Sequence, residues 1–398
     1  MQPSLGHSLE DNSWYDLAGN LVRQLPSGSA AFQMMEYDSL NRVSKRYTAF
    51  GPGNVTGDTI LQQDEMTYDD ASSVIFQVSR ERFHDATGTG PLTTPAGSQP
   101  KARVSYVANY PDPLGRVVNV ANYGTNAGSV LSRPSTCAAR SDVVLVTTTD
   151  YNNRGEAWQV TDPKAGVRRS AFDAAGRVTQ TIENYVSSGT GVDQNKTTNF
   201  TYNADGNLAT LTAVNATTGN QVTTYVYGTT LTDSDVASSR LLLAVVYPDS
   251  TSSSDRVEYK YNRLGERTEM KDQRGTVHSY DFDLLGRLVQ DRITTLPDSS
   301  AVDGAVRRVS RTYEYRGMLA KITCYSNATV GSGSIVNESA FTYHEFGQLT
   351  KEEQAHGGAV GSGTPAVQYT YANGSDNHIR PISVIYPDAR VLTFTYND

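Results

Sequence analysis

The sequence predicts an all-β fold in which repeated antiparallel β-hairpins form an extended, spiralling sheet. Two near copies, FDAAGRVTQ at 172–180 and FDLLGRLVQ at 282–290, lie far apart in the chain and indicate internal repeats. Tyr is frequent, at 24 residues against 10 Phe, and aromatic residues favour half-buried pleated strands. Long runs of helix-forming residues are missing, so we predict no helix; the segments most able to hold one helical turn are 127–134 and 234–243.

Further copies of the motif occur along the chain. The pattern is an aromatic residue, then Asp or Asn, then Gly three residues later, often Arg, and an apolar residue; the copy at Tyr68, YDDASSVI, matches it poorly. Copies begin at Tyr15, Tyr37, Tyr68, Tyr110 (with one extra residue), Tyr151, Tyr202, Tyr261 and Tyr343, and at Tyr313 if its aromatic is shifted by one. Gly155 and Gly176 are 21 residues apart, as are Gly265 and Gly286, so the unit has about 21 residues. Ser/Gly-rich loops such as 187–195 and 356–365 lengthen it.

Each unit is predicted to contain two strands and two turns. Residues 267–271 and 276–282 are strands joined by a turn at 272–275, and 207–214 pairs in the same way with 221–227. Residues 381–386 and 391–396 form a further hairpin. In 391–396 the alternation of residue types has period two, which predicts a strand with one buried face.

The motif has a physical explanation as a turn. Asp or Asn after the aromatic can accept a hydrogen bond from the backbone two residues on, and the Gly can adopt positive φ. Asn41 takes the place of Gly in one copy, and Asn is the next-best residue there. We expect the Arg to lie along the following strand and pair with an acidic neighbour. The residues assigned this structural role are Tyr15, Asp16, Gly19, Tyr37, Asp38, Asn41, Gly115, Arg116, Gly155, Phe172, Asp173, Gly176, Arg177, Tyr202, Gly206, Tyr261, Gly265, Phe282, Asp283, Gly286, Arg287 and Gly347.

These Tyr-Asp-x-x-Gly-Arg-Leu/Val copies resemble the YD repeats of the Rhs/YD-repeat family, which includes bacterial toxin-complex shells and animal teneurins. The resemblance covers nearly the whole chain. It divides the chain into a lead-in at 1–14 and a repeat region at 15–398, and we expect the chain to be part of a longer protein. It implies a segment of a hollow shell or barrel that encloses a C-terminal toxin or serves as an extracellular adhesion scaffold. Residues 112–116, DPLGR, resemble the cap motif of toxin-carrying relatives only superficially and are interpreted as an ordinary repeat.

The predicted function is therefore a structural shell segment of a large secreted or cell-surface bacterial protein, serving encapsulation or scaffolding. The alternatives are an extracellular adhesin or carbohydrate-binding module, with Trp14 and Trp158 as candidate glycan-stacking residues, and, less favoured, a polysaccharide-acting enzyme. Expected partners are an enclosed cargo polypeptide, neighbouring repeats, glycans, or further copies that pair with open sheet edges. A net charge of −8 with scattered Lys and Arg argues against nucleic acid.

No motif in the sequence indicates catalysis, a cofactor or a metal, so we expect no enzymatic activity. None of His7, His84, His278, His344, His356 and His378 lies two to four residues from another His or a Cys. Cys137 and Cys324 form no CxxC motif; a disulfide between them and two separate thiols both remain open. No apolar run of membrane-spanning length is present.

Overall fold

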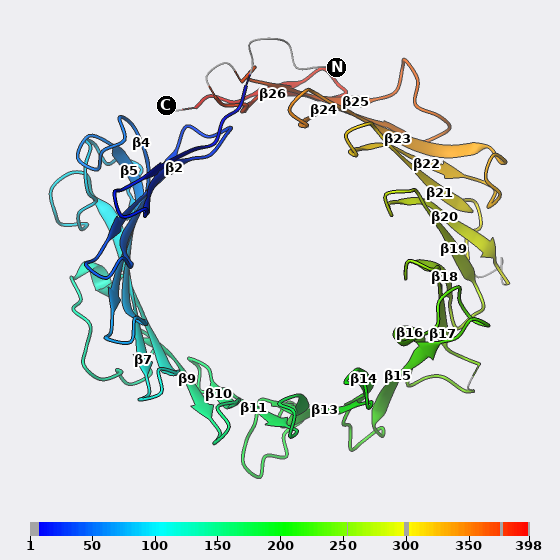
Figure 1. Cartoon of the computed structure of the whole chain (residues 1–398), viewed down its shortest axis with the longest axis horizontal. Helices are drawn as coiled ribbons and strands as arrows, with labels where there is room; N and C mark the ends of the chain where they lie inside the picture. The colour runs from blue at the N-terminus through cyan, green and yellow to red at the C-terminus, as the bar shows by residue number, and fades with distance from the viewer. Residues whose placement is uncertain (1–7, 253, 298–301, 375–376, 397–398) are drawn as a thin grey trace. The chain divides into compact units, whose positions relative to one another are not determined.

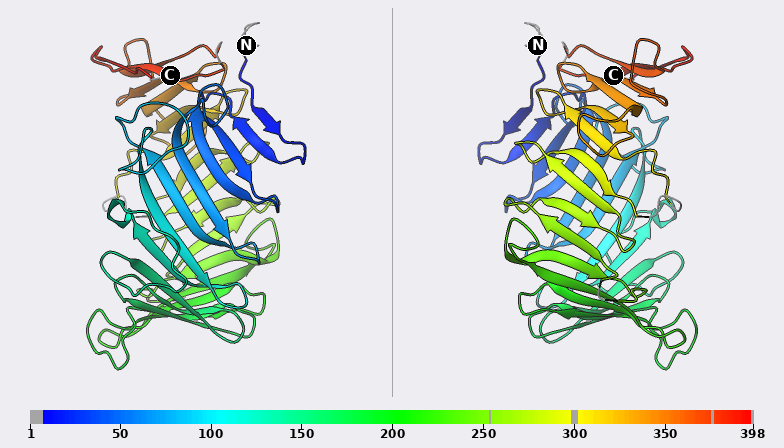
Figure 2. Two further views of the ribbon diagram at one scale, coloured as in Figure 1. Left: turned by 90° about the vertical axis from the view of Figure 1, so that its left-hand side faces the viewer. Right: turned by 90° about the vertical axis from the view of Figure 1, so that its right-hand side faces the viewer.

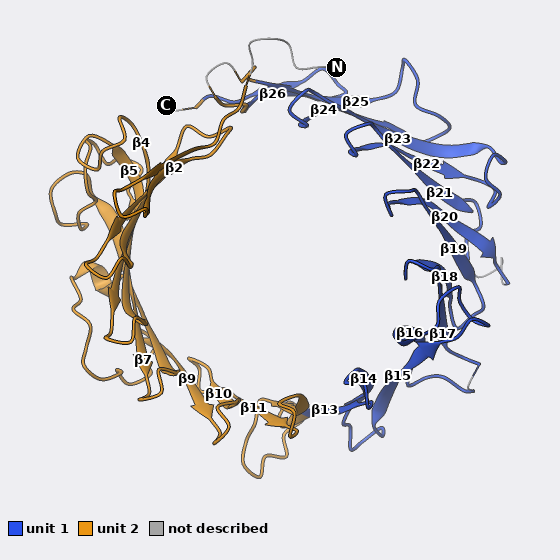
Figure 3. Cartoon of the chain, in the orientation of Figure 1, with its two compact units in different colours: residues 1–3, 197–371, 381–395 blue, residues 4–196, 372–380, 396–398 orange. Residues whose placement is uncertain are grey.

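The computed structural model describes residues 8–252, 254–297, 302–374 and 377–396, and its fold is all-β (Figure 1). The described residues contain 27 strands assigned to a single sheet, and a single short 3-10 turn, η1 (Asn126–Gly128). Strands that are adjacent in sequence pair antiparallel, as in β19 with β20 and β20 with β21. The predicted fold class is thus confirmed. The chain divides into two compact units, which are described separately (Figure 3).

Unit 2 comprises residues 4–196, 372–380 and 396–398. Its successive strands lie side by side (Figure 2, left). The strands are β1 (Asn12–Tyr15), β2 (Leu21–Leu25), β3 (Phe32–Tyr37), β4 (Val43–Phe50), β5 (Thr59–Tyr68), β6 (Val74–Arg82), β7 (Ala102–Pro111), β8 (Val117–Gly124), β9 (Leu145–Tyr151), β10 (Ala157–Thr161), β11 (Val167–Phe172) and β12 (Val178–Glu183).

The core of unit 2 lies between its strands and its longest connections. One cluster joins Phe32, Tyr47 and Ile60 on the strands to Leu92 in the connection 83–101. A second cluster, centred on Tyr106 of β7, packs against Leu131 and other residues of the connection 125–144. These connections therefore act as a second layer that removes one face of β3–β9 from water.

Residues 372–380 belong to unit 2 although they come late in the chain. The side-chain oxygen of Asn377 accepts a hydrogen bond from the backbone N–H of Glu10 at 2.7 Å, and its carbonyl accepts one from Gly28 at 3.1 Å. Ile379 is buried at 6% exposure. This segment is thus packed against the lead to β1 and the β2–β3 connection.

Unit 1 comprises residues 1–3, 197–371 and 381–395. Its hairpins also follow one another in sequence order (Figure 2, right). The strands from the unit boundary onward are β13 (Lys196–Tyr202), β14 (Leu208–Ala213), β15 (Gln221–Thr229), β16 (Ser238–Val246), β17 (Val257–Tyr261), β18 (Arg267–Lys271), β19 (Val277–Phe282), β20 (Leu288–Thr295), β21 (Arg308–Tyr313), β22 (Leu319–Tyr325), β23 (Ile335–Tyr343), β24 (Leu349–Ala355), β25 (Ala366–Tyr371), β26 (Pro381–Ile385) and β27 (Val391–Thr393).

Unit 1 buries fewer large side chains than unit 2. Most of its strand residues are half-buried, and several of its buried side chains are polar, such as Arg308 and Glu338. Glu338 accepts hydrogen bonds from Lys321 Nζ at 3.0 Å and Thr323 Oγ1 at 2.7 Å. These bonds satisfy a carboxylate that would be costly to bury alone.

Three sequence-based expectations need correction. Residues 234–243, proposed as able to hold a helical turn, run into strand β16, because Leu241–Leu243 pack as part of a sheet. η1 touches only the start of 127–134. Residues 391–396 alternate in type but are all exposed, since β27 pairs with β26 and the described residues place no second layer over either face.

Candidate functional site

The repeated motif forms a tight turn between two paired strands, and the turn at 283–287 between β19 and β20 is typical. Asp283 Oδ1 accepts hydrogen bonds from the backbone N–H groups of Leu285, at 2.9 Å, and Arg287, at 3.0 Å. Gly286 has φ +74°, and the register shifts beside Phe282, which marks a β-bulge. A turn followed by a left-handed Gly and a bulge is a common hairpin connection that strengthens strand twist.

Other copies have the same backbone geometry. Asn41 adopts φ +59°, as its place in the motif requires. The remaining motif glycines have φ between +79° and +86° at Gly19, Gly115, Gly155, Gly176, Gly206, Gly265 and Gly347. Side chains other than Asp can fill the acceptor position: Glu314 Oε1 accepts from Arg316 N at 3.0 Å, and His344 Nδ1 accepts from Phe346 N at 2.9 Å. The copy at Tyr313 therefore needs no shift of its aromatic, because Glu314 replaces the Asp.

The motif Arg binds the Asp of its own turn. Arg287 Nε donates to Asp283 Oδ2 at 2.7 Å, and Arg42, Arg116 and Arg177 contact Asp38, Asp112 and Asp173 in the same way. The hydrogen bond from Arg287 holds the pKa of Asp283 below its usual value. The acidic neighbour that the sequence predicts for this Arg is therefore the Asp of its own turn, four residues earlier.

The same Arg contacts the Tyr that opens the next motif copy on the neighbouring hairpin. The guanidinium carbon of Arg287 lies 4.3 Å from the centroid of the Tyr313 ring. Tyr313 in turn donates its hydroxyl to the carbonyl oxygen of Leu288 at 3.1 Å. Leu288 is the first residue of β20 and Tyr313 the last of β21, so the phenol joins two adjacent hairpins at the edge where the turns lie. We call this contact the tyrosine interlock.

The tyrosine interlock recurs in both units. Each Tyr donates to the carbonyl of a residue in the strand before its own. The donor–acceptor pairs are Tyr37 with Leu21, Tyr68 with Val43, Tyr151 with Val117, Tyr261 with Leu242, Tyr343 with Leu319 and Tyr371 with Leu349. The Arg stack is also present over Tyr68 and Tyr151.

The copy at Tyr110 departs from this pattern because of its extra residue. Pro111 occupies the strand position beside the turn, and a shift of one residue turns a strand side chain to the opposite face. Tyr110 is consequently buried at 7% exposure in the core of unit 2. Its hydroxyl bonds to Tyr123 and to the Pro134 carbonyl.

Both Trp residues are partly covered by an Arg. The Arg23 guanidinium lies 4.4 Å from the Trp14 ring centroid, and that of Arg169 lies 5.0 Å from the Trp158 ring centroid. Trp14 is 39% exposed, whereas Trp158 is half-buried. These stacks occupy ring surface that a sugar would use, so glycan stacking by either residue stays a prediction.

The structure brings together no metal-like cluster among the described residues: no group of three or more His, Cys, Asp or Glu side chains converges there. Cys137 and Cys324 are free thiols, and burial raises the pKa of both. His278 Nδ1 lies 2.8 Å from Asp291 Oδ1 on the neighbouring strand. The described helical segment is too short and polar to cross a membrane.

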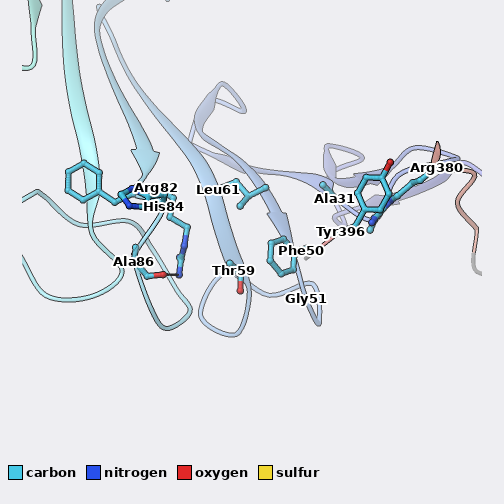
Figure 4. Close-up of a pocket in the computed structure, with 12 residues that line it drawn as sticks. Ala31, Phe50, Gly51, Thr59, Leu61, Arg82, His84, Ala86, Arg380 and Tyr396 are labelled. Atoms are coloured by element: carbon cyan, nitrogen blue, oxygen red, sulfur yellow. Dashed lines mark hydrogen bonds between the residues drawn. The ribbon is translucent and has the colours of Figure 1, made fainter. Parts of the chain in front are cut away.

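Unit 2 also contains an open groove of about 830 Å³ (Figure 4). Its apolar lining includes Phe50 and Leu61, and its cationic groups include Arg82. Arg82 Nη2 donates to the carbonyls of Ala86 at 3.0 Å and Gly88 at 2.8 Å, and burial lowers the pKa of Arg82. The groove can therefore hold an apolar partner beside a fixed positive charge. Sequence reasoning missed it, because carbonyl ligands of an Arg have no residue signature.

Comparisons with known proteins concern the fold. No protein-family model and no curated protein sequence matches the chain. The chain is similar to a crystal structure of TcdB2-TccC3-TEV, with 13% identity and a TM-score of 0.48 over 96% of this chain and 17% of that chain. The chain is also similar to a crystal structure of TcdB2-TccC3-Cdc42, with 14% identity and a TM-score of 0.47 over 97% of this chain and 21% of that chain. A structure of the Photorhabdus luminescens Tc holotoxin pore is 13% identical to the chain, with a TM-score of 0.39 over 95% of this chain and 23% of that chain. The chain thus spans less than a quarter of each of these solved chains.

Proposed function

We propose that this chain is a structural segment of a YD-repeat shell, part of a large secreted or cell-surface bacterial protein, and that it serves encapsulation or scaffolding. The observation that carries the proposal is the tyrosine interlock, which joins neighbouring hairpins at seven described positions, from Tyr37 to Tyr371. A hairpin cannot bury an apolar face alone, so a device that fixes each hairpin to the next supports a role in building an extended wall.

The use of the motif side chains supports a structural rather than a catalytic role. Asp283 is fully engaged by its own turn and by Arg287, and the face of the Arg287 guanidinium lies on Tyr313. The hydroxyl of Tyr313 is engaged with Leu288. In this described copy, the repeated groups therefore hold neighbouring hairpins together, which supports a structural use of the motif.

Native-state hydrogen exchange tests the structural role. The amides of Asp291 and Val309, which pair between β20 and β21 and point toward each other, should exchange as slowly as amides inside single hairpins. Fast exchange at such junctions, with slow exchange within each hairpin, would show that the hairpins do not form one wall and would contradict the proposal.

Encapsulation is tested with the complete gene product from its native source. After brief proteolysis, mass spectrometry identifies which segments outside residues 1–398 survive. Encapsulation predicts that a cargo segment resists protease while the sheet is folded and is cut once urea unfolds it. Cutting of all other segments while the sheet stays intact would exclude encapsulation and leave scaffolding as the function. Fractionation of the native cells tests the proposed extracellular or surface location.

A further inference from the structure

Four side chains stand in register across the first four strands of unit 2. Trp14 on β1 pairs with Arg23 on β2, Arg23 with Met34 on β3, and Met34 with Tyr47 on β4. Directly paired residues project from the same face of a sheet. This row lines a pocket of about 320 Å³, whose other wall comes from the β4–β5 connection, including Gly53. The volume lies at the small end of ligand pockets.

Arg23 is the unusual member of this row. Its guanidinium carbon lies 4.4 Å from the Trp14 ring centroid and 4.1 Å from that of Phe32, so both guanidinium faces are covered. Its Nε is buried and has no hydrogen-bond partner, and no carboxylate of the described residues forms an ion pair with Arg23. The motif arginines, such as Arg287, are instead paired with Asp. A buried donor on a cation without an acceptor is costly, and an anion in the pocket would relieve that cost.

The β4–β5 connection is fitted closely around this guanidinium. A Cβ added to Gly53 would lie 1.8 Å from Arg23 Nη1, so any other residue there would displace the Arg. The Gly53 N–H donates to Oδ1 of the fully buried Asp58 at 2.7 Å, which holds the connection in place. The position of Arg23 is thus fixed by stacking on two sides and by backbone on a third.

The other charges of the pocket select the kind of anion. Glu36 also lines it, but its carboxylate is engaged by the Tyr47 hydroxyl at 2.8 Å and by Lys45 Nζ at 3.0 Å. One free guanidinium beside an existing carboxylate favours a monoanion over a doubly charged phosphate. Val22 and Met35 make much of the remaining wall apolar.

We propose that this pocket binds a small monocarboxylate with an apolar body, whose carboxylate accepts hydrogen bonds from the edge of Arg23 while its apolar part contacts Trp14. Such a group could come from a free organic acid or from the C-terminal residue of a peptide. Guanidinium N–H groups match carboxylate oxygens in geometry, and a charged hydrogen bond in a half-buried site is worth more than one in water.

The test uses the two Trp residues, since they are the chain's only ones. In the Trp158→Phe protein, tryptophan emission comes from Trp14 alone. Adding phenylacetate or N-acetyl-leucine should change the intensity of this emission. The neutral phenylacetamide should bind about tenfold or more weakly than phenylacetate. The better of the two acids identifies the source of the carboxylate. Equal affinity for the acid and its amide would overturn the proposal without any change at Arg23. In the Trp14→Phe protein, emission from Trp158 should not respond.

A comparison of two Arg→Met variants tests whether the carboxylate binds at Arg23. Arg23→Met keeps the length and apolar body of the side chain and should remove the preference for the acid over the amide. Arg169→Met is the matched control, because Arg169 also stacks on a Trp of unit 2 but lies outside the pocket lining. It should leave affinity unchanged. Retention of the acid preference in Arg23→Met, with a native circular dichroism spectrum, would refute the assignment of Arg23.

Discussion

The hydroxyl of Tyr313 donates to the carbonyl oxygen of Leu288 at 3.1 Å, across the boundary between two hairpins. The ladder between β20 and β21 is described from Arg292↔Arg308 to Gln290↔Ser310, so the phenol adds a contact beyond its end. It also gives the Leu288 carbonyl a partner, and a buried or half-buried carbonyl without one is unfavourable. The motif Tyr is therefore a connector between hairpins as well as an apolar strand residue.

Removal of this single hydroxyl tests its energetic role. Tyr313→Phe should lower the free energy of unfolding of unit 1 by about 0.5–1.5 kcal/mol, the usual net value of one hydrogen bond. Urea denaturation followed by tyrosine fluorescence gives the change. Tyr247→Phe is the control in the same unit, since Tyr247 is 40% exposed and forms no described hydroxyl bond. Equal losses in both variants would mean that the hydroxyl of Tyr313 contributes nothing specific.

The left-handed Gly of the turn gives a second prediction. Gly286→Val should destabilise the β19–β20 hairpin by about 1–3 kcal/mol, because φ is +74° and a β-branched residue is strained there. An added Cβ would also lie 2.8 Å from Glu266 Oε1, although that side chain can move. Thermal unfolding measures the loss. Gly361→Val, at a glycine without positive φ and with open space around it, should change the midpoint little. A stable Gly286→Val protein would contradict the turn assignment.

The motif turn and the contact between neighbouring hairpins differ in how far the sequence predicts them. The turn at 283–287 is predictable, because every group that defines it lies within five residues and Asp and Gly have few other reasons to occur at that spacing. The Tyr313 acceptor is not, since it is a backbone carbonyl 25 residues earlier and any residue supplies one. The Arg23 pocket is hidden for a similar reason. It depends on the register of four strands and on the path of the β4–β5 connection, neither of which leaves a motif.

The ion pairs within the turns predict a dependence of stability on pH. Hydrogen bonds from Arg116, Arg177 and Arg287 lower the pKa values of Asp112, Asp173 and Asp283 from their ordinary value of 3.8. A carboxyl whose pKa is lower in the folded state contributes stability above its unfolded pKa and loses it as pH falls through the folded pKa. Thermal midpoints should therefore fall as pH drops below about 4.

The triple variant D112N/D173N/D283N isolates these groups. It should be less stable than the natural chain at neutral pH, and the difference between the two should shrink on acidification, because protonated Asp resembles Asn. Midpoints measured across the acidic range give the comparison. A difference that stays constant down to the lowest pH would show that the three carboxylates stabilise the turns no more when charged than when neutral.

The sequence leaves open whether Cys137 and Cys324 form a disulfide, and in the structure both are free thiols. Cys137 packs against the core of unit 2 and Cys324 is half-buried on β22, and burial raises the pKa of each thiol. Less thiolate and less access both slow alkylation. Near pH 8, iodoacetamide should therefore modify both residues much more slowly in the folded protein than in urea, as followed by intact mass. Without reductant, both should still react fully in urea; a chain that resists alkylation there until it is reduced would contain the disulfide instead.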